Sequence, residues 1–183
     1  MSEKNIKITG SFYISAEYEH EEQYLSEMHK KGWKFKKDNG VWLTFEKCEP
    51  EDAVYKIDFR DEIKDKDSYI KMFEDYGWEY VSETYGFYFF RKKAVGISPE
   101  DLEIFSDNES KLEMLKRIIF RYQLPLFASF MLSMTTTLYI IKNPDPVAVA
   151  IIILFCILFV LYIYILIRSF ISYSKLKKKC SKK

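Results

Sequence analysis

Cysteine and histidine are scarce in this sequence, and their scarcity excludes several kinds of site. The three cysteines, Cys48, Cys156 and Cys180, are scattered over 183 residues, so they provide neither a disulfide framework nor a four-cysteine zinc site. The two histidines, His20 and His29, are nine residues apart, which does not place them at ligand spacing on one helix face. We therefore expect surface histidines, no metal, no cofactor and a reducing compartment.

Catalytic and phosphate-binding motifs are also absent. The chain contains no G-x-G-x-x-G, G-x-x-x-x-G-K-[ST], G-x-S-x-G or H-E-x-x-H pattern. The carboxylates between Glu46 and Asp61 could serve acid/base chemistry or bind a cation, but they lack a histidine and the spacing of a calcium loop. The sequence therefore favours a protein that is not an enzyme, with an acidic loop at this position.

Acidic residues are almost missing from the C-terminal part, where only Asp145 follows Glu113 while eleven Lys or Arg do. Residues 1–113 carry the remaining acids and are net negative, which argues against direct binding of nucleic acid. The N-terminus lacks the apolar run of a signal peptide. One chain therefore has two electrostatic halves, and the overall net charge of +1 describes neither.

Two long uncharged runs lie in the basic half. Residues 147–167 carry no charge, and a helix of that length spans the roughly 30 Å hydrocarbon core of a bilayer. Residues 122–141 form a second, slightly more polar run, and the loop 142–146 between them contains two prolines. The sequence predicts two transmembrane helices joined as a hairpin.

Positive charge near the ends of these runs predicts their orientation. Seven Lys or Arg lie in the tail 168–183, four bases precede the first run, and the loop contains only Lys142. Cytoplasmic loops carry the excess of Lys and Arg, and such clusters bind anionic lipid headgroups. We expect a multi-pass protein of the cytoplasmic membrane, with both termini in the cytoplasm and membrane lipids as partners.

Residues 1–93 contain an internal repeat at an offset of 45 residues. Three pairs coincide, namely Tyr24 with Tyr69, Gly32 with Gly77 and Trp33 with Trp78. In each copy, alternating residues (6–14 and 53–59) predict a strand, an apolar stripe ending at glycine predicts a helix, and two further strands (33–37 with 41–47, and 78–82 with 87–91) predict a hairpin.

The predicted fold class is therefore α+β, with a β-α-β-β unit written twice. The six strands would form one antiparallel or mixed sheet with two helices on one face, in the style of ferredoxin-like folds. The helices would cover a face made of Phe12, Ile14, Phe35, Leu43, Phe45, Ile57 and Phe59.

The opposite sheet face is the candidate binding site. Its residues mix charge with aromatic rings, and the candidates are Lys34, Lys36, Trp42, Lys56, Asp58, Arg60 and Tyr88. Such a face is either plain solvated surface or the surface that meets a ligand, a partner or a second copy of the chain. Residues 94–121 are expected to be a helical linker, with helix starts at Ser98 and near Asp107.

The run from Trp42 to Phe59, between Gly32-Trp33 and Gly77-Trp78, carries the pattern F-x-K-x-x-P-x-x-x-x-Y-x-I-D. In this pattern, and over roughly residues 7–92, the chain resembles an uncharacterised bacterial family, domain of unknown function 2812. The resemblance implies a soluble domain followed by two hydrophobic segments, often encoded beside PadR-type transcriptional repressors in Gram-positive bacteria. It implies no catalytic residues.

The leading hypothesis is a membrane-anchored cytoplasmic module that binds a partner protein or a small ligand, with a PadR-type repressor among the candidate partners. An alternative is an accessory subunit of a membrane transporter, or an immunity protein, acting through the transmembrane hairpin. A third class is an enzyme that uses the carboxylates between Glu46 and Asp61. The duplicated aromatic domain and the missing catalytic motifs favour the first.

Overall fold

The computed structural model describes residues 5–10, 18–98, 100–105, 107–142 and 146–180, without the side chains of residues 135, 136, 138–142, 148 and 179. The predictions for Phe12 and Ile14, and most of the loop 142–146, therefore lie outside the described residues. The chain divides into two compact units, Met1–Met114 and Leu115–Lys183.

The first unit contains the predicted repeat. One copy is β1 (Ile6–Gly10), α1 (Tyr18–Lys30), β2 (Trp33–Asp38) and β3 (Trp42–Lys47); the other is β4 (Ala53–Phe59), α2 (Lys66–Asp75), β5 (Glu79–Thr84) and β6 (Phe87–Lys93). Each copy forms an antiparallel three-stranded sheet with its last strand in the centre, in the orders β1-β3-β2 and β4-β6-β5. Both sheets shift register at the same repeat position, Lys36 in β2 and Val81 in β5. The duplicated β-α-β-β order is confirmed.

The single six-stranded sheet expected from the sequence is wrong. β2 lies beside β5, and the Thr84 hydroxyl donates to the Asp38 carbonyl, but no strand ladder joins the two sheets within the described residues. The Phe35 ring from β2 instead contacts Phe89 and Tyr55 of the second sheet, with ring centres 5.1 and 6.1 Å apart. The sheets therefore meet through side chains rather than through backbone hydrogen bonds.

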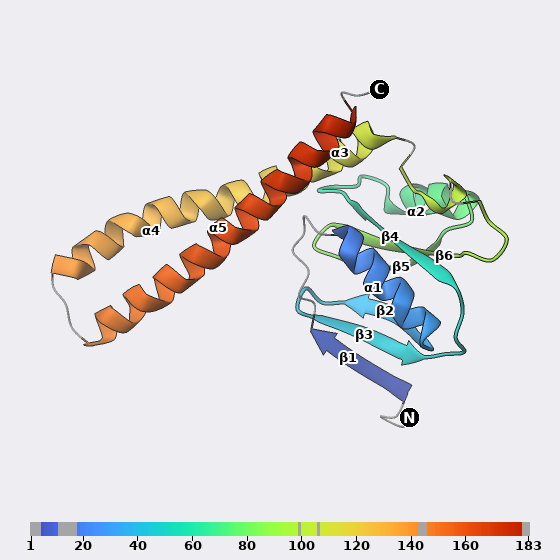
Figure 1. The fold of residues 1–183 in the computed structure, drawn as a ribbon, viewed down its shortest axis with the longest axis horizontal. Coiled ribbons are helices and arrows are strands. Elements are labelled where there is room, and N and C mark those ends of the chain that lie inside the picture. Colours follow the sequence, from blue (N-terminus) through green and yellow to red (C-terminus); the bar gives the residue numbers. More distant parts are fainter. Residues whose placement is uncertain (1–4, 11–17, 99, 106, 143–145, 181–183) are drawn as a thin grey trace. The chain divides into compact units, whose positions relative to one another are not determined.

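Helix α1 packs on the first sheet and also covers an edge of the second (Figure 1). Tyr24 contacts Phe45 edge to face, with ring centres 6.1 Å apart. On its other side, Ser26 Oγ accepts the N–H of Tyr55 at 3.2 Å, and Glu22 Oε1 accepts the N–H of Ile57 at 2.9 Å. Since β4 is an edge strand, these bonds satisfy donors that would otherwise be open to pairing.

Helix α2 covers a different sheet face. Phe73 stacks on Phe90 at 4.1 Å, and both belong to a buried cluster with Trp78 and Tyr88. In β6, Tyr88 and Phe90 alternate with Phe89, which faces Phe35 and the first sheet. The expectation that both helices share one face is therefore wrong, because the second sheet packs against the first with one face and against α2 with the other. The predicted core residues Phe35, Leu43, Phe45, Ile57 and Phe59 are all buried.

The linker expected at residues 94–121 is helical in its second part. A short 3₁₀ turn, η3 (Glu100–Leu102), precedes α3 (Asn108–Ile118), a π-helical turn η4 (Ile119–Gln123) and α4 (Leu124–Lys142). Asp107 Oδ1 accepts the N–H of Ser110 at 2.7 Å, which caps α3 as the sequence predicts. The π turn precedes Pro125, which has no N–H to continue the helical bonds.

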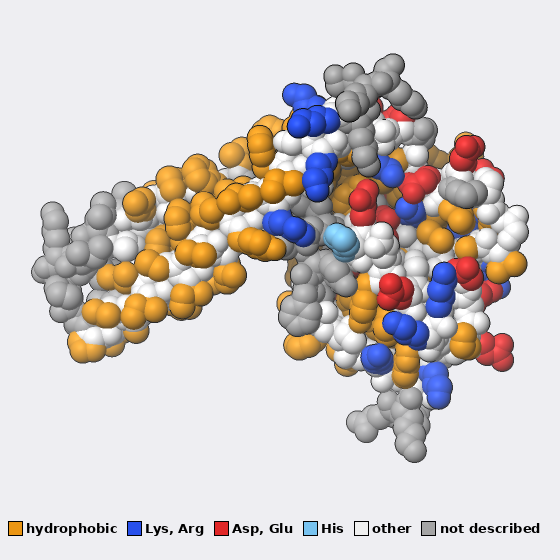
Figure 2. Space-filling model, in the orientation of Figure 1, with side chains coloured by type: hydrophobic (Ala, Val, Ile, Leu, Met, Phe, Trp, Pro, Cys, Tyr) orange, Lys and Arg blue, Asp and Glu red, His pale blue; other side chains and the backbone are white. Residues whose placement is uncertain are grey.

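Helix α5 (Pro146–Cys180) is the longest element, and its segment Val149–Lys178 is long and apolar enough to cross a membrane. Hydrophobic side chains cover most of the visible surface of α4 and α5 (Figure 2). Within the described residues α5 is the one candidate span, so the predicted transmembrane hairpin is corrected to a single span; the side chains of the second half of α4 lie largely outside the described residues. Phe130 of α4 stacks on Tyr162 of α5 with ring centres 5.0 Å apart.

Candidate functional site

The seven residues predicted to form one open face lie in separate environments. Trp42 is 50% exposed at the surface of the first sheet, where Lys36 is also exposed and pairs with Glu46 at 3.1 Å. Lys56 is half-buried in a cluster of ion pairs, and Lys34 lines a pocket between the repeats. The structure therefore does not bring the seven together.

Asp58, Arg60 and Tyr88 lie beside α2. Asp58 is 1% exposed, and its Oδ2 accepts hydrogen bonds from Arg60 Nε at 2.9 Å and from the Tyr69 hydroxyl at 2.8 Å. Tyr88 is buried in the cluster under α2. Because the Asp58 carboxylate accepts bonds from both Arg60 and Tyr69, it is a buried group that holds α2 to β4.

A second group of charges links β4 to α1 and to the segment before α3. Lys56 Nζ lies 3.2 Å from Glu22 Oε2 and 2.8 Å from Glu103 Oε1, and Lys111 Nζ lies 2.8 Å from Glu103 Oε2. Burial raises the pKa of the Glu22 carboxyl to about 7, although Lys56 and the N–H of Ile57 act against this shift. This cluster can respond to pH near neutrality.

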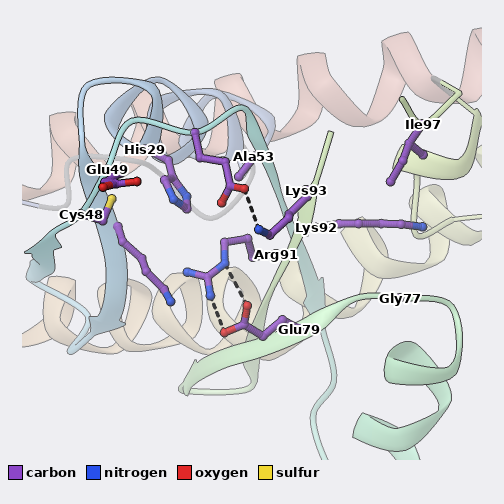
Figure 3. A pocket seen from close by; sticks show the side chains of 12 residues that line it. His29, Cys48, Glu49, Ala53, Gly77, Glu79, Arg91, Lys92, Lys93 and Ile97 are labelled. Carbon is purple, nitrogen blue, oxygen red and sulfur yellow. Dashed lines mark hydrogen bonds and ion pairs between the residues drawn. The ribbon is translucent and has the colours of Figure 1, made fainter. Parts of the chain in front are cut away.

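A polar pocket of about 640 Å³ lies between the two repeats (Figure 3). Its wall combines the end of α1, strand β2 and the β3–β4 connection with β5, β6 and the segment after β6. The lining residues are His29, Lys34, Cys48, Glu49, Glu51, Ala53, Gly77, Glu79, Arg91, Lys92, Lys93 and Ile97. Neither repeat alone supplies this wall.

His29 is buried in this pocket, so its expected place at the surface is wrong. It is 3% exposed, and its Nδ1 lies 2.9 Å from the Tyr55 hydroxyl, which also accepts the N–H of Phe35 at 3.3 Å. Burial, and then the positive charge of Arg91, lower the pKa of His29. The imidazole is therefore neutral at physiological pH. The other histidine, His20, is exposed as predicted.

Arg91 is the charged group at the base of the pocket. It is 5% exposed, its Nε donates to Glu79 Oε2 at 3.2 Å, and its Nη2 forms a second ion pair with Glu79 Oε1. Burial opposes the ionised form of Glu79, but the bond to Arg91 outweighs this effect and lowers the pKa of the carboxyl. The remaining nitrogen, Nη1, is buried and forms no hydrogen bond of good geometry with a described residue, while the guanidinium lies beside the Tyr55 ring, 5.9 Å from its centre, and interacts with this side chain.

The sequence reasoning missed Arg91, although a signal was present. Strand β6 alternates Phe87, Phe89 and Arg91 on one face, and period two therefore places the guanidinium on the same face as the partly buried Phe87 and the buried Phe89. An arginine in such a position is rarely buried without partners. The alternation can be seen in the sequence, whereas the approach of His29 from the other repeat cannot.

The other charges of the pocket differ in how fully they are paired. Lys93 pairs with Glu51 at 2.7 Å, and Lys92 Nζ donates to the carbonyls of Tyr76 and Asp101 at 2.8 and 3.0 Å. Lys34, by contrast, forms no ion pair with a described residue. In the described part of the chain, no three His, Cys, Asp or Glu side chains are arranged to hold a metal ion. The pocket can bind a polar ligand through unpaired donors.

Comparison with known proteins agrees with the resemblance seen in the sequence. No curated protein and no solved structure matches the chain. The family model described as "Protein of unknown function (DUF2812)" matches residues 17–129, which is more than half of the chain and extends beyond the duplicated domain into α4. Within the matched region, the motif residues Phe45, Tyr55, Ile57 and Asp58 are buried, so the pattern marks the packing of the two repeats. The chain belongs to the DUF2812 family.

Proposed function

We propose that the protein is a membrane-anchored binding module, in which α5 holds the chain in the membrane and the duplicated domain binds a small ligand between its repeats. The observation that carries the proposal is the pocket with Arg91 at its base. A buried donor without a partner costs about 1–3 kcal/mol, and a ligand that accepts its hydrogen bond removes this cost. Ligand pockets commonly combine such convergent polar groups with an apolar wall.

The anchoring half of the proposal is supported by α5. Side chains along its candidate span are exposed, for example Val160 at 67% and Ile167 at 54%. Apolar surface of this extent is stable in contact with lipid or with other membrane helices. The basic residues Lys175 and Lys178 lie near the end of α5, so this end would face the anionic cytoplasmic leaflet.

Ligand binding can be tested on the full-length chain in lipid nanodiscs. All three tryptophans, Trp33, Trp42 and Trp78, lie in the duplicated domain, so their fluorescence reports its thermal unfolding. A small molecule that binds the folded domain raises the melting temperature. We expect at least one class in a panel of bacterial metabolites to do so in the wild type.

A variant that obstructs the pocket provides the control. Glu49 is exposed at the pocket wall, and Glu49→Phe places an aromatic ring there without removing a buried group. The stabilisation by the metabolite should disappear in Glu49→Phe and persist in Glu74→Phe, which changes an exposed residue on α2. A panel without effect, or equal stabilisation of both variants, would contradict the proposed function.

A second candidate function is docking of a protein partner on the first sheet. Ile8 is 63% exposed and Trp42 is 50% exposed there, and exposed apolar side chains are typical of docking surfaces. The resemblance adds a PadR-type repressor as the partner to test. Crosslinking to such a repressor should be lost in Trp42→Ala and kept in Tyr85→Ala, which alters another exposed aromatic residue. Equal crosslinking of both would contradict this function.

A further inference from the structure

The donors of the pocket between the repeats converge from three elements. Arg91 from β6 presents its unpartnered Nη1, and Lys34 from β2 forms no ion pair with a described residue. The two lie close enough to His29 that both positive charges act on its imidazole. Figure 3 shows the His29 ring directed toward the side of the pocket where the Arg91 guanidinium lies. All three side chains line the same pocket.

The hydrogen bonds of His29 favour a third donor. Since the Tyr55 hydroxyl already accepts the N–H of Phe35, its own proton is free to be donated to His29 Nδ1. Nitrogen Nε2 of the neutral ring then carries the imidazole proton and can donate it. This tautomer makes His29 a donor toward the pocket rather than an acceptor.

The carboxylates of the pocket are engaged by other cations. Glu79 is occupied by Arg91, and Glu51 by Lys93, which leaves only the exposed Glu49 without an assigned cation. Arg91 cannot lose its proton at physiological pH, so its positive charge is permanent. Among the charged groups of the pocket, Arg91 Nη1 and Lys34 are therefore donors without an anionic partner among the described residues, and Glu49 is the one carboxylate without a cation, at the exposed edge of the wall.

We propose that this pocket binds an oxyanion, the carboxylate or phosphate group of a small molecule, through Arg91 Nη1, Lys34 and His29. The inference rests on the proposed ligand-binding function and names its ligand class. Charge-assisted bonds from guanidinium and ammonium groups to carboxylate or phosphate oxygens are the strongest that side chains form. Glu79 holds the guanidinium in place and leaves one of its nitrogens for the ligand.

The test uses four probes that share an aromatic ring and differ in the attached group: phenyl phosphate, benzoate, benzyl alcohol and benzylamine. Full-length protein in phosphatidylcholine nanodiscs is labelled with ¹⁵N-histidine, which gives signals from only His20 and His29. We expect phenyl phosphate and benzoate to shift the His29 signals along a saturable curve at constant ionic strength. His20, which is exposed, serves as the internal reference and should not move.

Matched variants locate the anion. Lys34→Gln removes a cation that forms no ion pair with a described residue. It should weaken binding of phenyl phosphate and benzoate about tenfold, as expected for one charge-assisted bond. Lys36→Gln removes an exposed cation on the same strand and should leave their affinities unchanged. Arg91→Lys keeps the charge but loses the planar fork, and it should weaken binding more than Lys34→Gln does.

The outcomes separate this inference from the proposed function. Binding of benzylamine or benzyl alcohol as tight as that of the two anions would overturn the oxyanion assignment and leave a ligand-binding pocket. No saturable shift of His29 with any probe, or equal affinities in Lys34→Gln and Lys36→Gln, would also overturn it, while the metabolite panel judges the proposed function separately. Nanodiscs with phosphatidic acid distinguish the source: a shift of His29 without any probe identifies a lipid headgroup as the oxyanion.

Discussion

His29 Nδ1 lies 2.9 Å from the hydroxyl of Tyr55, and this contact joins the last turn of α1 in the first repeat to β4 in the second. The same hydroxyl accepts the N–H of Phe35 in β2. One phenolic oxygen therefore connects three elements and forms the wall behind the pocket. The contribution of the Tyr55 hydroxyl to the free energy of unfolding can be measured separately from its effect on ligand binding in the pocket.

Tyr55→Phe removes both hydrogen bonds and leaves the aromatic packing. We expect a loss of about 1–3 kcal/mol in the free energy of unfolding, because the N–H of Phe35 and the ring of His29 lose a buried partner. Urea titration of the full-length protein, followed by tryptophan fluorescence, gives this value. Tyr76→Phe, at a position that is 74% exposed, is the control, and equal unfolding midpoints for the two variants would disprove the prediction.

Asp58→Asn tests the buried carboxylate beside α2. The amide cannot accept charge-assisted bonds from both Arg60 and Tyr69, so we expect a loss of about 2–3 kcal/mol in unfolding free energy. The same substitution at the exposed Asp75 should change stability by less than about 0.5 kcal/mol. Thermal melting checks both, and a melting temperature of Asp58→Asn equal to that of the wild type would refute the role of Asp58.

Gly86→Ala and Gly96→Ala form a pair at similar backbone angles, with φ of +83° and +75°. An added Cβ at Gly86 would lie 2.6 Å from the carbonyl oxygen of Arg60, whereas at Gly96 it meets nothing within 4 Å. We therefore expect about 1 kcal/mol of backbone strain at both positions and a further, larger destabilisation at Gly86 alone. Denaturation midpoints measure the difference, and equal effects would contradict the close approach.

The pH dependence of stability should reveal Glu22. Its pKa is about 7 in the folded protein and has the ordinary value of 4.5 when unfolded, so between these values the folded state binds more protons. The stabilisation is therefore complete below pH 4.5 and is lost as the pH rises through 7, a change of about 3 kcal/mol at most. Glu21, whose pKa is raised by burial to about 8, acts in the same direction.

Unfolding free energies measured from pH 4.5 to 8 check this decrease of stability with rising pH. Glu22→Gln should reduce it without removing it, since Glu21 remains. Glu27→Gln, an exposed position on the same helix, should leave it unchanged. His29, whose pKa is lowered by burial, acts in the opposite direction, so the comparison between variants is decisive. A pH dependence of Glu22→Gln equal to that of the wild type would show that the Glu22 carboxyl is ionised throughout.

Membrane attachment by α5 predicts a strong effect of charge in its middle. Replacing Leu154, Leu158 and Leu161 with arginine adds about 8–10 kcal/mol to the free energy of insertion. These side chains are exposed along the helix, so the change does not disturb a protein core. The variant should move from the carbonate-washed membrane pellet to the soluble or aggregated fraction, while the triple alanine variant stays in the pellet. Retention of the arginine variant in the pellet would rule out α5 as the anchor.

Local patterns were sufficient for much of this fold. Strand alternation, the glycines that end the helices and the offset of 45 residues between Tyr24 and Tyr69 placed all six strands and both helices of the domain. They could not say how the two copies pack. No local pattern shows whether the second copy extends the first sheet through backbone hydrogen bonds or packs on it through side chains, as Phe35 and Phe89 do.

The candidate site shows the same division. Of the seven residues predicted from the open face, only Lys34 lines the pocket, while Asp58 and Tyr88 are buried under α2. The prediction failed because alternation distinguishes the two faces of a strand but not what covers each face. Arg91 was recognisable from its alternation with Phe87 and Phe89, but its unpaired nitrogen depends on the position of Glu79 across the sheet.

The sequence by itself determined the repeat, the order of its elements and the long apolar helix α5, because these depend on periodicity and composition along the chain. Only the tertiary structure decided that the sheets stay separate, that α1 and α2 cover different faces, and that His29, Lys34 and Arg91 surround one pocket. These three residues are up to 62 positions apart in the sequence. Their proximity arises from the packing of one repeat on the other, which no local pattern encodes.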